Sequence, residues 1–391
     1  MKKMLILGAM KMHVPVIKRM KERGIHVITC DYLPENIGHK YADEAYFDST
    51  TDCQAVLKLA ERLKVDGIMT FCSDPAAYTV SYVADKLNLP GNPVSAIKIL
   101  SEKDTFRKFQ KAHGFDCPQF ICCESIDDAT DNVCQLKFPV VIKPVDSSGS
   151  KGVYKLNSAD EISECWNESI RYSRCRRVIL EEFIEKKGYQ LQGDAYFADG
   201  ELKFICLGDE HADVEPLGTT YPSVLSSDMM DKVAADVERC LKLVGFNRGG
   251  LNIEVRIGKD DRIHIVEIGA RNGGHYNVEA IRRMTGFDFY DHAIDAALGI
   301  PYKEEPPMNN GLFANMILYS KKEGVFSGIE YSDELKDCIV DEFFYVEKGD
   351  VVEPYHGSNT SIGIVILKFG SVEQMLRLAD NFNDYYKVVF E

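Results

Sequence analysis

The sequence lacks any hydrophobic run long enough for a membrane. No apolar run approaches the roughly 18 residues that are needed to cross a bilayer. The N-terminal stretch reaches a turn at Gly8, which is too early for a signal peptide. We therefore expect a cytoplasmic protein without a membrane partner.

Paired cysteines and a surplus of basic residues are also absent. The 12 cysteines are scattered singly apart from Cys122 and Cys123, without CxxC pairs or matching histidine spacing, so neither a zinc site nor a disulfide framework is indicated. Asp and Glu total 61 against 46 for Lys and Arg, and the formal charge of −15 argues against a nucleic-acid partner. Any phosphate that the protein handles must therefore be bound locally.

The remaining composition is that of an ordinary globular protein. The chain has 391 residues, which leaves room for two or three domains and a large buried core. Its 45% hydrophobic and 27% charged content is typical of soluble domains.

Strands and helices alternate from the start of the chain to about residue 90. Short apolar runs are separated by amphipathic segments, and Gly24 ends the first of these. The expected strands are 4–8, 27–31 and 67–71, and the expected helices are 14–23, 55–63 and 76–87. This alternation predicts a doubly wound parallel α/β domain over residues 1–93, which ends in a Pro- and Gly-containing linker.

The rest of the chain mixes strands and helices without an internal repeat. One helix is expected over residues 95–113, and a Pro-rich, acidic stretch at 301–310 marks a second boundary. Strands are expected near Val140 and Val153, a helix at 162–171, a strand at 178–183, and hairpins with helices over 190–300. We therefore expect two further parts, residues 94–300 and 301–391.

A predicted β-hairpin near residue 260 brings two carboxylates together. The stretches 250–258 and 262–274 each alternate apolar and polar side chains over several positions, and the residues between them favour a tight turn that pairs Lys259 with Arg262. Counting back along both strands places Glu254 directly opposite Glu267. Facing carboxylates require a compensating cation, and their oxygen atoms suit Mg²⁺ or Mn²⁺. Arg271, two residues after Gly269, is suited to phosphate. The alternative is a solvent-exposed hairpin with scattered charges.

A second motif combines lysines with a flexible loop. A strand ends at Lys143, and the loop that follows has small residues whose backbone N–H groups can converge on an anion. Lys103, near the start of the helix upstream, is a further cation for the same anion, as is Arg107. The loop residues concerned are Ser147, Ser148, Gly149, Ser150, Lys151 and Gly152. The alternative is an ordinary hairpin turn.

The strand at 178–183 ends in a composition that suits an adenine base. Backbone groups of Glu181 and Glu182 can read the edge of the base, while Phe183 and Ile184 supply apolar walls. Gln190, Glu185 and Asp194 are candidates for contacts to ribose or to neighbouring groups of the site. His211 is a candidate proton shuttle, although a single histidine in a loop more often only forms hydrogen bonds.

Two competing interpretations of the N-terminal region fail on their details. The loop after the first strand lacks the second and third glycines of a dinucleotide-binding fingerprint, although Asp31 stands where a ribose-binding acid would. Residues 9–12 match the tetrapeptide around a biotinylated lysine, but Lys11 follows a buried strand instead of lying at the tip of a hairpin. We therefore expect neither a dehydrogenase nor a biotin carrier.

The motifs resemble, in their order and spacing, those of the ATP-grasp superfamily of carboxylate–amine ligases. The resemblance covers nearly the whole chain and implies an α/β and α+β architecture. A preceding α/β domain (1–93) is followed by the two-lobed ATP-grasp fold (94–300, with a lid subdomain at about 115–185) and a small C-terminal lobe (301–391). It also implies that Lys103 and Lys143 contact the phosphates of ATP, that the 146–153 loop closes over them, and that residues 181–184 bind adenine.

One departure from the superfamily concerns the metal. The resemblance implies that Glu254 and Glu267 hold magnesium, but many members have an asparagine as a further ligand where this chain has Gly269. Asn272 is a candidate replacement. The Glu-Ile-Gly-x-Arg-x-Gly-Gly form looks more like ligases that join amino acids to each other or to other carboxylates than like biotin carboxylase.

The reaction implied by this resemblance is amide formation. ATP phosphorylates a carboxylate, and an amine attacks the acyl phosphate, while Arg271 and Lys143 stabilise the developing charge. The expected partners are therefore a small-molecule carboxylate and an amine, together with ATP and Mg²⁺ or Mn²⁺, in a possible homodimer. The alternatives are an ATP- and bicarbonate-dependent carboxylase of the same superfamily and a non-catalytic nucleotide-binding regulator.

Overall fold

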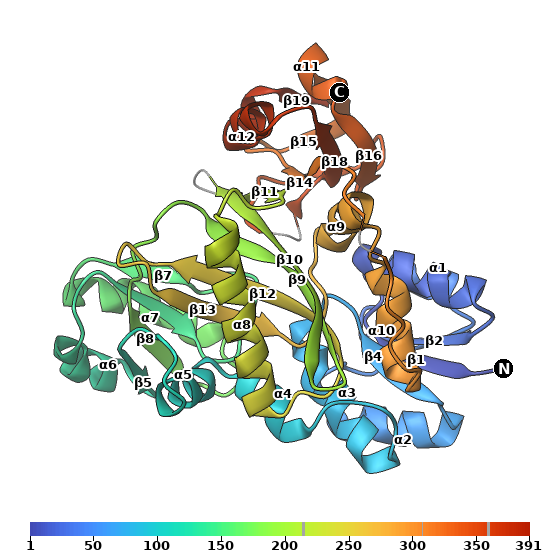
Figure 1. The fold of residues 1–391 in the computed structure, drawn as a ribbon, viewed down its shortest axis with the longest axis horizontal. Coiled ribbons are helices and arrows are strands. Elements are labelled where there is room, and N and C mark those ends of the chain that lie inside the picture. Colours follow the sequence, from blue (N-terminus) through green and yellow to red (C-terminus); the bar gives the residue numbers. More distant parts are fainter. Residues whose placement is uncertain (213–215, 307, 358–359) are drawn as a thin grey trace.

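The opening of the chain forms the parallel sheet that the sequence predicts. The computed structural model describes residues 1–212, 216–306, 308–357 and 360–391, and its first four strands lie in the order β3-β2-β1-β4 (Figure 1). These strands and their helices are β1 (Lys3–Leu7), α1 (Val14–Glu22), β2 (His26–Cys30), β3 (Glu44–Tyr46), α2 (Cys53–Leu63), β4 (Gly67–Thr70) and α3 (Asp74–Leu87). Strand β3 escapes prediction because its three residues are too few to show an apolar alternation.

The single helix expected over residues 95–113 is two helices. α4 (Val94–Ser101) stops at Glu102, whose backbone is extended (φ −102°, ψ 112°), and α5 (Lys103–Ala112) begins at the next residue. The backbone N–H of Lys103 donates to the carbonyl of Val145 at 3.0 Å instead of continuing the first helix. The prediction was wrong because the apolar periodicity runs through both helices, whereas a tertiary hydrogen bond marks the break.

A small antiparallel sheet follows, and we call this part, residues 120–182, the lid. Its strands have the order β5-β8-β6-β7. Its elements are β5 (Phe120–Cys123), α6 (Ile126–Asn132), β6 (Val140–Pro144), β7 (Tyr154–Leu156), α7 (Ile162–Arg171) and β8 (Val178–Glu182). The lid has its own hydrophobic cluster, which includes Ile142, Leu156 and the only tryptophan of the chain, Trp166.

An eight-stranded sheet forms the middle of the molecule, in the order β13-β12-β9-β10-β11-β14-β18-β16. Because β11 pairs with β14, the sheet continues across residue 301 into the C-terminal part of the chain. Helices α4, α5 and α8 (Ser227–Val244) contribute to the same apolar cluster as Leu251 and Ile253 of the sheet. The strands are β9 (Gln190–Ala198), β10 (Glu201–Ala212), β11 (Pro216–Tyr221), β12 (Gly249–Ile257), β13 (Ile263–Gly269), β14 (Leu312–Leu318), β16 (Ile339–Phe344) and β18 (Gly363–Phe369).

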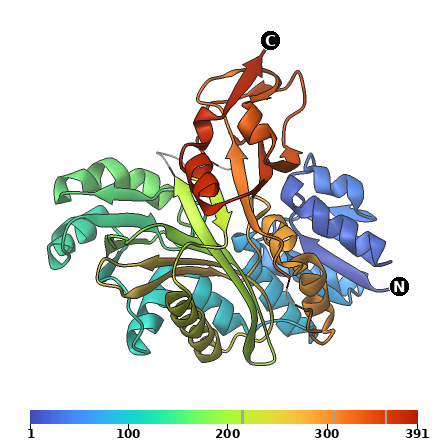
Figure 2. The same cartoon turned by 45° about the horizontal axis from the view of Figure 1, so that its top comes forward.

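The C-terminal part adds a three-stranded sheet in the order β17-β15-β19. Figure 2 shows from a second direction that the lid, the N-terminal sheet and these C-terminal strands project from different sides of the eight-stranded sheet. None of the helices in the described ranges is both long enough and apolar enough to span a membrane. The added elements are β15 (Gly324–Tyr331), α11 (Asp333–Lys336), β17 (Val351–Val352), α12 (Val372–Asp380) and β19 (Tyr386–Phe390).

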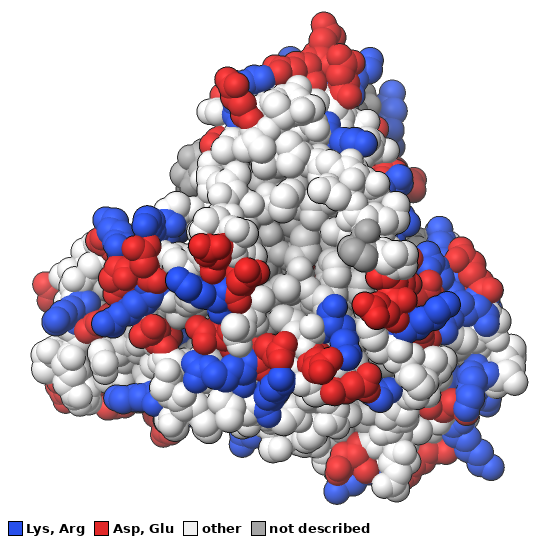
Figure 3. Space-filling model, viewed as in Figure 1, with Lys and Arg blue, Asp and Glu red and all other residues white. Residues whose placement is uncertain are grey.

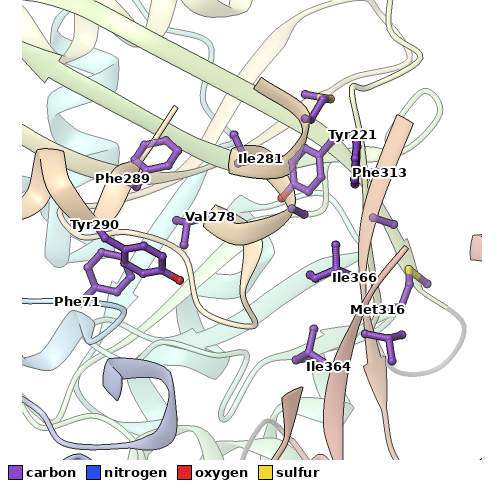
Figure 4. Packing of buried hydrophobic residues seen from close by; sticks show 14 of the residues in the cluster. Phe71, Tyr221, Val278, Ile281, Phe289, Tyr290, Phe313, Met316, Ile364 and Ile366 are labelled. Carbon is purple, nitrogen blue, oxygen red and sulfur yellow. The ribbon is translucent and has the colours of Figure 1, made fainter. Parts of the chain in front are cut away.

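The largest hydrophobic cluster joins the N-terminal sheet to the C-terminal strands through α9 (Asn277–Thr285) and α10 (Phe289–Leu298). Phe71, just after β4, stacks on Tyr290 of α10 with ring centroids 5.2 Å apart. Figure 4 shows the cluster continuing past Ile281 to Phe313 and Ile364. Burial of this apolar surface holds both ends of the chain against the middle sheet.

We expect Ile142→Ala to destabilise the lid by about 2–5 kcal/mol, because Ile142 is fully buried in the lid cluster and truncation leaves a cavity. Trp166 reports the loss directly, since its fluorescence shifts to longer wavelength when the lid unfolds in urea. Val153→Ala is the matched control, because 37% of Val153 is exposed, and it should change the free energy of unfolding by less than about 0.5 kcal/mol. Equal shifts for the two variants would contradict the assignment of Ile142 to the lid core.

Candidate functional site

The hairpin of β12 and β13 places Glu254 directly opposite Glu267, as predicted, but the turn and the strand register that produce this pairing differ from the prediction. The prediction of a tight turn between Lys259 and Arg262 was wrong. The turn is one residue longer, because the N–H of Gly258 donates to the carbonyl of Arg262 at 2.9 Å. The longer turn alone would shift the register. A β-bulge compensates, since Val255 lies opposite Ile265 whereas Glu254 lies opposite Glu267, which leaves Val266 as the extra residue.

Burial and neighbouring carboxylates disfavour the charged form of Glu254. Burial, followed by the charges of Glu267 and Glu210, raises the pKa of Glu254 to about 8. Gln190, a predicted nucleotide contact, donates to Glu210 at 2.7 Å and accepts from Arg256 at 2.5 Å. The arrangement therefore favours a proton or a metal ion beside Glu254.

The donor set suits a hard cation that also binds phosphates. No group of three or more His, Cys, Asp or Glu side chains within the described ranges is arranged to hold a metal ion. Glu254 and Glu267 would therefore surround the ion only in part, and other ligands would fill its remaining coordination positions. Mg²⁺ is commonly bound in this way, by one or two carboxylates plus substrate phosphates and water.

Lys103 lies between the carboxylate pair and the loop of residues 147–152, which we call the Ser/Gly loop. Its Nζ donates to the carbonyl of Ser147 at 2.5 Å and is 3.7 Å from Oε2 of Glu267. The break between α4 and α5 puts Lys103 at the first residue of α5, next to the end of β6. The structure therefore brings a cation from one predicted motif to a carboxylate of the other.

Lys143 and Arg107 share one buried carboxylate, Glu181. Nζ of Lys143 is 2.5 Å from Oε2 of Glu181, and Nε of Arg107 donates to Oε1 at 2.9 Å. Burial alone would raise the pKa of Glu181, but Arg107 and Lys143 lower it to about 2. Arg107 also donates to the carbonyl of Val266 at 2.9 Å, and Val266 is the bulge residue that restores the hairpin register. Sequence reasoning treated Arg107 only as a second choice beside Lys103.

The Ser/Gly loop is anchored at its two ends. Asp146 accepts hydrogen bonds from the backbone N–H groups of Arg174 and Cys175, at 3.0 and 3.1 Å. Gly152 has φ +71°, and a Cβ there would meet Ser169 at 3.0 Å, so only glycine fits this end without strain. Between the anchors Ser147 and Ser148 are half-buried, and the residues that are exposed are Gly149, Ser150 and Lys151. The exposed middle is thus available to an anion.

Two backbone N–H groups of the predicted adenine-binding segment already form hydrogen bonds to neighbouring residues. The N–H of Glu182 donates to Gln119 and that of Phe183 to Pro139, both at 2.9 Å. The ring of Phe183 carries the ammonium of Lys155 at 4.0 Å from its centroid, and Ile184 is half-buried. The side chain of Glu181 is held in the ion pairs described above, so this segment offers a ring, an aliphatic side chain and its remaining backbone groups.

Two predicted residues after β13 meet partners from other elements. Arg271 pairs with Asp74, which follows β4 of the N-terminal sheet. Asn272 is 2% exposed, and its amide donates to Oδ1 of Asp194 at 3.2 Å. Burial raises the pKa of Asp194 to about 6 despite a hydrogen bond from the backbone of Gly273. The Asn272 side chain is thus engaged with a buried carboxylate on β9.

His211 connects β10 to the C-terminal part of the chain. Its Nδ1 lies 2.7 Å from Asp380 of α12, its Nε2 lies 2.9 Å from the hydroxyl of Thr220, and its ring packs on Tyr189. Burial lowers the pKa of His211 although Asp380 favours the charged form. Both ring nitrogens therefore already have hydrogen-bonding partners within the protein.

The charged residues of the site do not belong to a surface of one sign. On the face shown in Figure 3, Lys and Arg are interspersed with Asp and Glu over the projecting parts, and the hollow between them carries few charges. Local pairs such as Lys103 with Glu267, and Lys143 with Glu181, therefore set the electrostatics of the site.

Comparison with known proteins gives two matches to family models and weak sequence similarity to curated proteins. The carbamoyl phosphate synthase large chain of Thermoanaerobacter pseudethanolicus is 25% identical over 303 residues, which cover 74% of this chain and 27% of that protein. The corresponding protein of Campylobacter jejuni is 24% identical over 273 residues, 65% of this chain and 24% of that protein. The chain thus spans about a quarter of the length of these relatives.

Solved structures share the fold over the whole chain. The L-amino acid ligase from Bacillus licheniformis has a TM-score of 0.81 at 19% identity, covering 100% of this chain and 99% of that one. Phosphoribosylglycinamide synthetase from Anaerococcus prevotii has a TM-score of 0.77 at 22% identity and covers 100% of both chains. The biotin carboxylase domain of the Hydrogenobacter thermophilus 2-oxoglutarate carboxylase has a TM-score of 0.77 at 17% identity, covering 99% of this chain and 90% of that one.

The family models agree with the motifs that sequence and structure bring together. Residues 136–279 match the ATP-grasp domain, and residues 316–391 match the L-amino acid ligase C-terminal domain 2. The chain therefore contains an ATP-grasp domain over residues 136–279 and a match to the L-amino acid ligase C-terminal domain 2 over residues 316–391, and it shares its fold with the solved structures above.

Proposed function

We propose that the protein is an ATP-dependent ligase that joins a small carboxylate to an amine through an acyl phosphate. The products are an amide or peptide-like bond, ADP and phosphate. The observation that carries the proposal is the facing pair Glu254 and Glu267 with Lys103 at 3.7 Å from the latter, because this set of charges suits a nucleotide phosphate with its metal ion. The similarity to an L-amino acid ligase and to phosphoribosylglycinamide synthetase supports C–N bond formation.

The metal in this proposal is Mg²⁺, with Mn²⁺ as a second hard cation of the same ligand preference. Glu254 and Glu267 would hold it, and its charge would offset that of the phosphates of ATP. The raised pKa of Glu254 fits this assignment, because a divalent cation relieves the same repulsion that otherwise retains a proton. A cytoplasmic location belongs to the same proposal.

The lysines bind and orient the nucleotide. Lys143 is held by Glu181 at the end of β6, so its ammonium has a fixed position next to the phosphates. Lys103 exchanges its contacts with Ser147 and Glu267 for phosphate oxygens, which leaves Glu267 free for the metal ion. The exposed middle of the Ser/Gly loop then covers the phosphates, and residues 182–184 face the base.

Arg271 stabilises the reacting carboxylate. Its guanidinium stays protonated, since burial is outweighed by Asp74 and its pKa lies above the ordinary arginine value. It therefore offers a permanent positive charge to the acyl phosphate and to the tetrahedral intermediate that the amine forms. His211 is assigned no step, because both of its ring nitrogens are engaged with Asp380 and Thr220. The amide nitrogen of Asn272 is engaged with Asp194, so only its amide oxygen would be available as a further metal ligand.

A bicarbonate-dependent carboxylase is the second candidate. The similarity to carbamoyl phosphate synthase and to a biotin carboxylase domain favours it, because bicarbonate in place of an organic carboxylate would use the same phosphate and metal contacts. The match of residues 316–391 to a ligase C-terminal domain favours the amide-forming reaction.

The function is tested by measuring ADP release over pairs of amino acids and small carboxylates with Mg²⁺. We expect ADP to form only when a carboxylate and an amine are both present, and mass spectrometry to detect a product equal to their sum less one water. ADP release that is stimulated by bicarbonate without any amine would select the carboxylase. No ADP with any carboxylate would favour a nucleotide-binding regulator and contradict both enzymes.

Glu267→Gln should lower turnover by about a hundredfold or more while ATP binding weakens far less, because one metal ligand is lost but Lys143 and the loop remain. ADP release and the binding of a non-hydrolysable ATP analogue measure the two effects separately. Glu201→Gln is the control, since Glu201 is exposed and pairs only with Lys203. Full activity of the Glu267 variant with Mg²⁺ would refute the metal assignment.

Glu254→Gln should raise the melting temperature of the metal-free protein at pH 8 and leave it unchanged near pH 4. The pKa of Glu254 is raised to about 8 in the folded state, so stability falls as the pH rises from about 4.5, where the unfolded carboxyl ionises, to about 8. The amide removes this penalty. Thermal denaturation in EDTA at both pH values measures it, and Mg²⁺ should stabilise the wild type more than the variant at pH 8. An equal melting temperature of the two proteins at pH 8 would count against the raised pKa of Glu254.

A further inference from the structure

A two-point ion pair joins the N-terminal sheet to the corner after β13. Nε of Arg271 donates to Oδ1 of Asp74 at 2.7 Å, and Nη2 donates to Oδ2 at 2.5 Å. The side chains are 12% and 23% exposed, so solvent weakens the contact little. Asp74 is the first residue of α3, which follows β4 after the short segment 71–73, and Asp74 and Arg271 are 197 positions apart in the chain.

Gly269 makes room for this ion pair. A Cβ at position 269 would meet Oδ1 of Asp74 at 2.9 Å and the guanidinium carbon of Arg271 at 3.3 Å. The Asp74 carboxylate thus occupies space that a side chain at position 269 would need. The glycine that departs from the expected asparagine is explained by a group that enters from another part of the chain.

The ion pair fixes the direction in which Arg271 presents its free donors. A guanidinium has five N–H groups, and here two are bound by Asp74 and a third by the carbonyl of Asn272 at 3.1 Å. Two N–H groups of Arg271 are left for an anion. Asp74 interacts in addition with Lys103 and with the hydroxyl of Ser148, which, with Arg271, keep its pKa below the ordinary value although burial raises it.

Apolar packing does not completely fill the interface at this corner. A cavity lies along the same interface, and its lining includes Thr70 of β4, Arg248 and Ala270. Polar contacts therefore contribute to the connection here: the ion pair on one side, and on another the hydrogen bonds between Asn92 and the backbone of Arg248, at 2.9 and 3.0 Å.

We propose that Asp74 is a positioning residue for the ligation step, which holds Arg271 against the acyl phosphate from the N-terminal sheet. The inference rests on the proposed function, since it assigns Arg271 to the reacting carboxylate. Asp74 itself touches neither substrate. Its loss leaves Arg271 charged but free to turn away, so the chemical step slows while substrates still bind.

The first test compares Asp74→Asn with the wild type in the ADP-release assay. We expect kcat to fall at least about tenfold, with the KM values of ATP, carboxylate and amine within about twofold. Asp291→Asn is the matched control, because Asp291 also pairs with arginines of the N-terminal part, Arg19 and Arg23, away from the site. Its kinetics should equal those of the wild type.

The second test adds a side chain at position 269 and then removes the carboxylate at position 74. Gly269→Asn alone should inactivate the enzyme, because the new side chain collides with the Asp74 carboxylate. Adding Asp74→Ala removes that carboxylate, so the double variant should recover at least about tenfold in kcat over Gly269→Asn, but not beyond the kcat of Asp74→Asn, because Arg271 still lacks its partner. This recovery also excludes simple misfolding as the cause of the first loss.

Three outcomes separate the hypotheses. An active wild type whose kcat is unchanged by Asp74→Asn overturns the positioning role and leaves the proposed function intact. A higher KM for carboxylate or amine at constant kcat also overturns it, because Asp74 would then bind that substrate directly. A wild type without ADP formation on any carboxylate overturns the proposed function, and this role with it.

Discussion

The hydrogen bonds of the buried Arg107 guanidinium are the contacts on which the geometry of the site depends. They link α5 to Glu181 at the end of the lid strand β8 and to the carbonyl of Val266 in the bulge of β13. Without that bulge the longer hairpin turn would bring Glu267 out of register with Glu254. Removing one member of a buried ion pair leaves an uncompensated charge that costs about 3–5 kcal/mol. One side chain therefore couples the position of Lys143, through Glu181, to the carboxylate pair.

Contacts between polar or charged side chains also join other parts of the chain. Asp74 reaches from the N-terminal sheet to Arg271, and Asp380 reaches from α12 to His211. Each contact joins elements that are far apart in sequence, whereas the apolar clusters hold each part together and join the N-terminal and C-terminal parts. Hydrophobic burial sets which layers pack together, and the directional ion pairs set how side chains point at the site.

The fold was largely predictable because its elements carry strong local patterns. The alternation up to residue 90, the helix over 162–171 and the pairing of Glu254 with Glu267 appear in the structure. The errors share one cause. The break at Glu102 and the three-residue turn before Arg262 are accompanied by hydrogen bonds to distant or cross-strand groups, which periodicity does not report. In the hairpin, the misplaced turn and the unforeseen bulge cancelled.

The sequence by itself determined the chemical inventory and its order: lysines, a small-residue loop, paired glutamates and an arginine, on segments whose period indicates strand or helix. Only the tertiary structure decided which charges meet. Glu181 turned out to hold Lys143 and Arg107, and Asp74 to fill the space beside Gly269. Spacing along one strand fixes which face a side chain occupies, but its partner comes from another element, whose approach depends on packing of the whole chain.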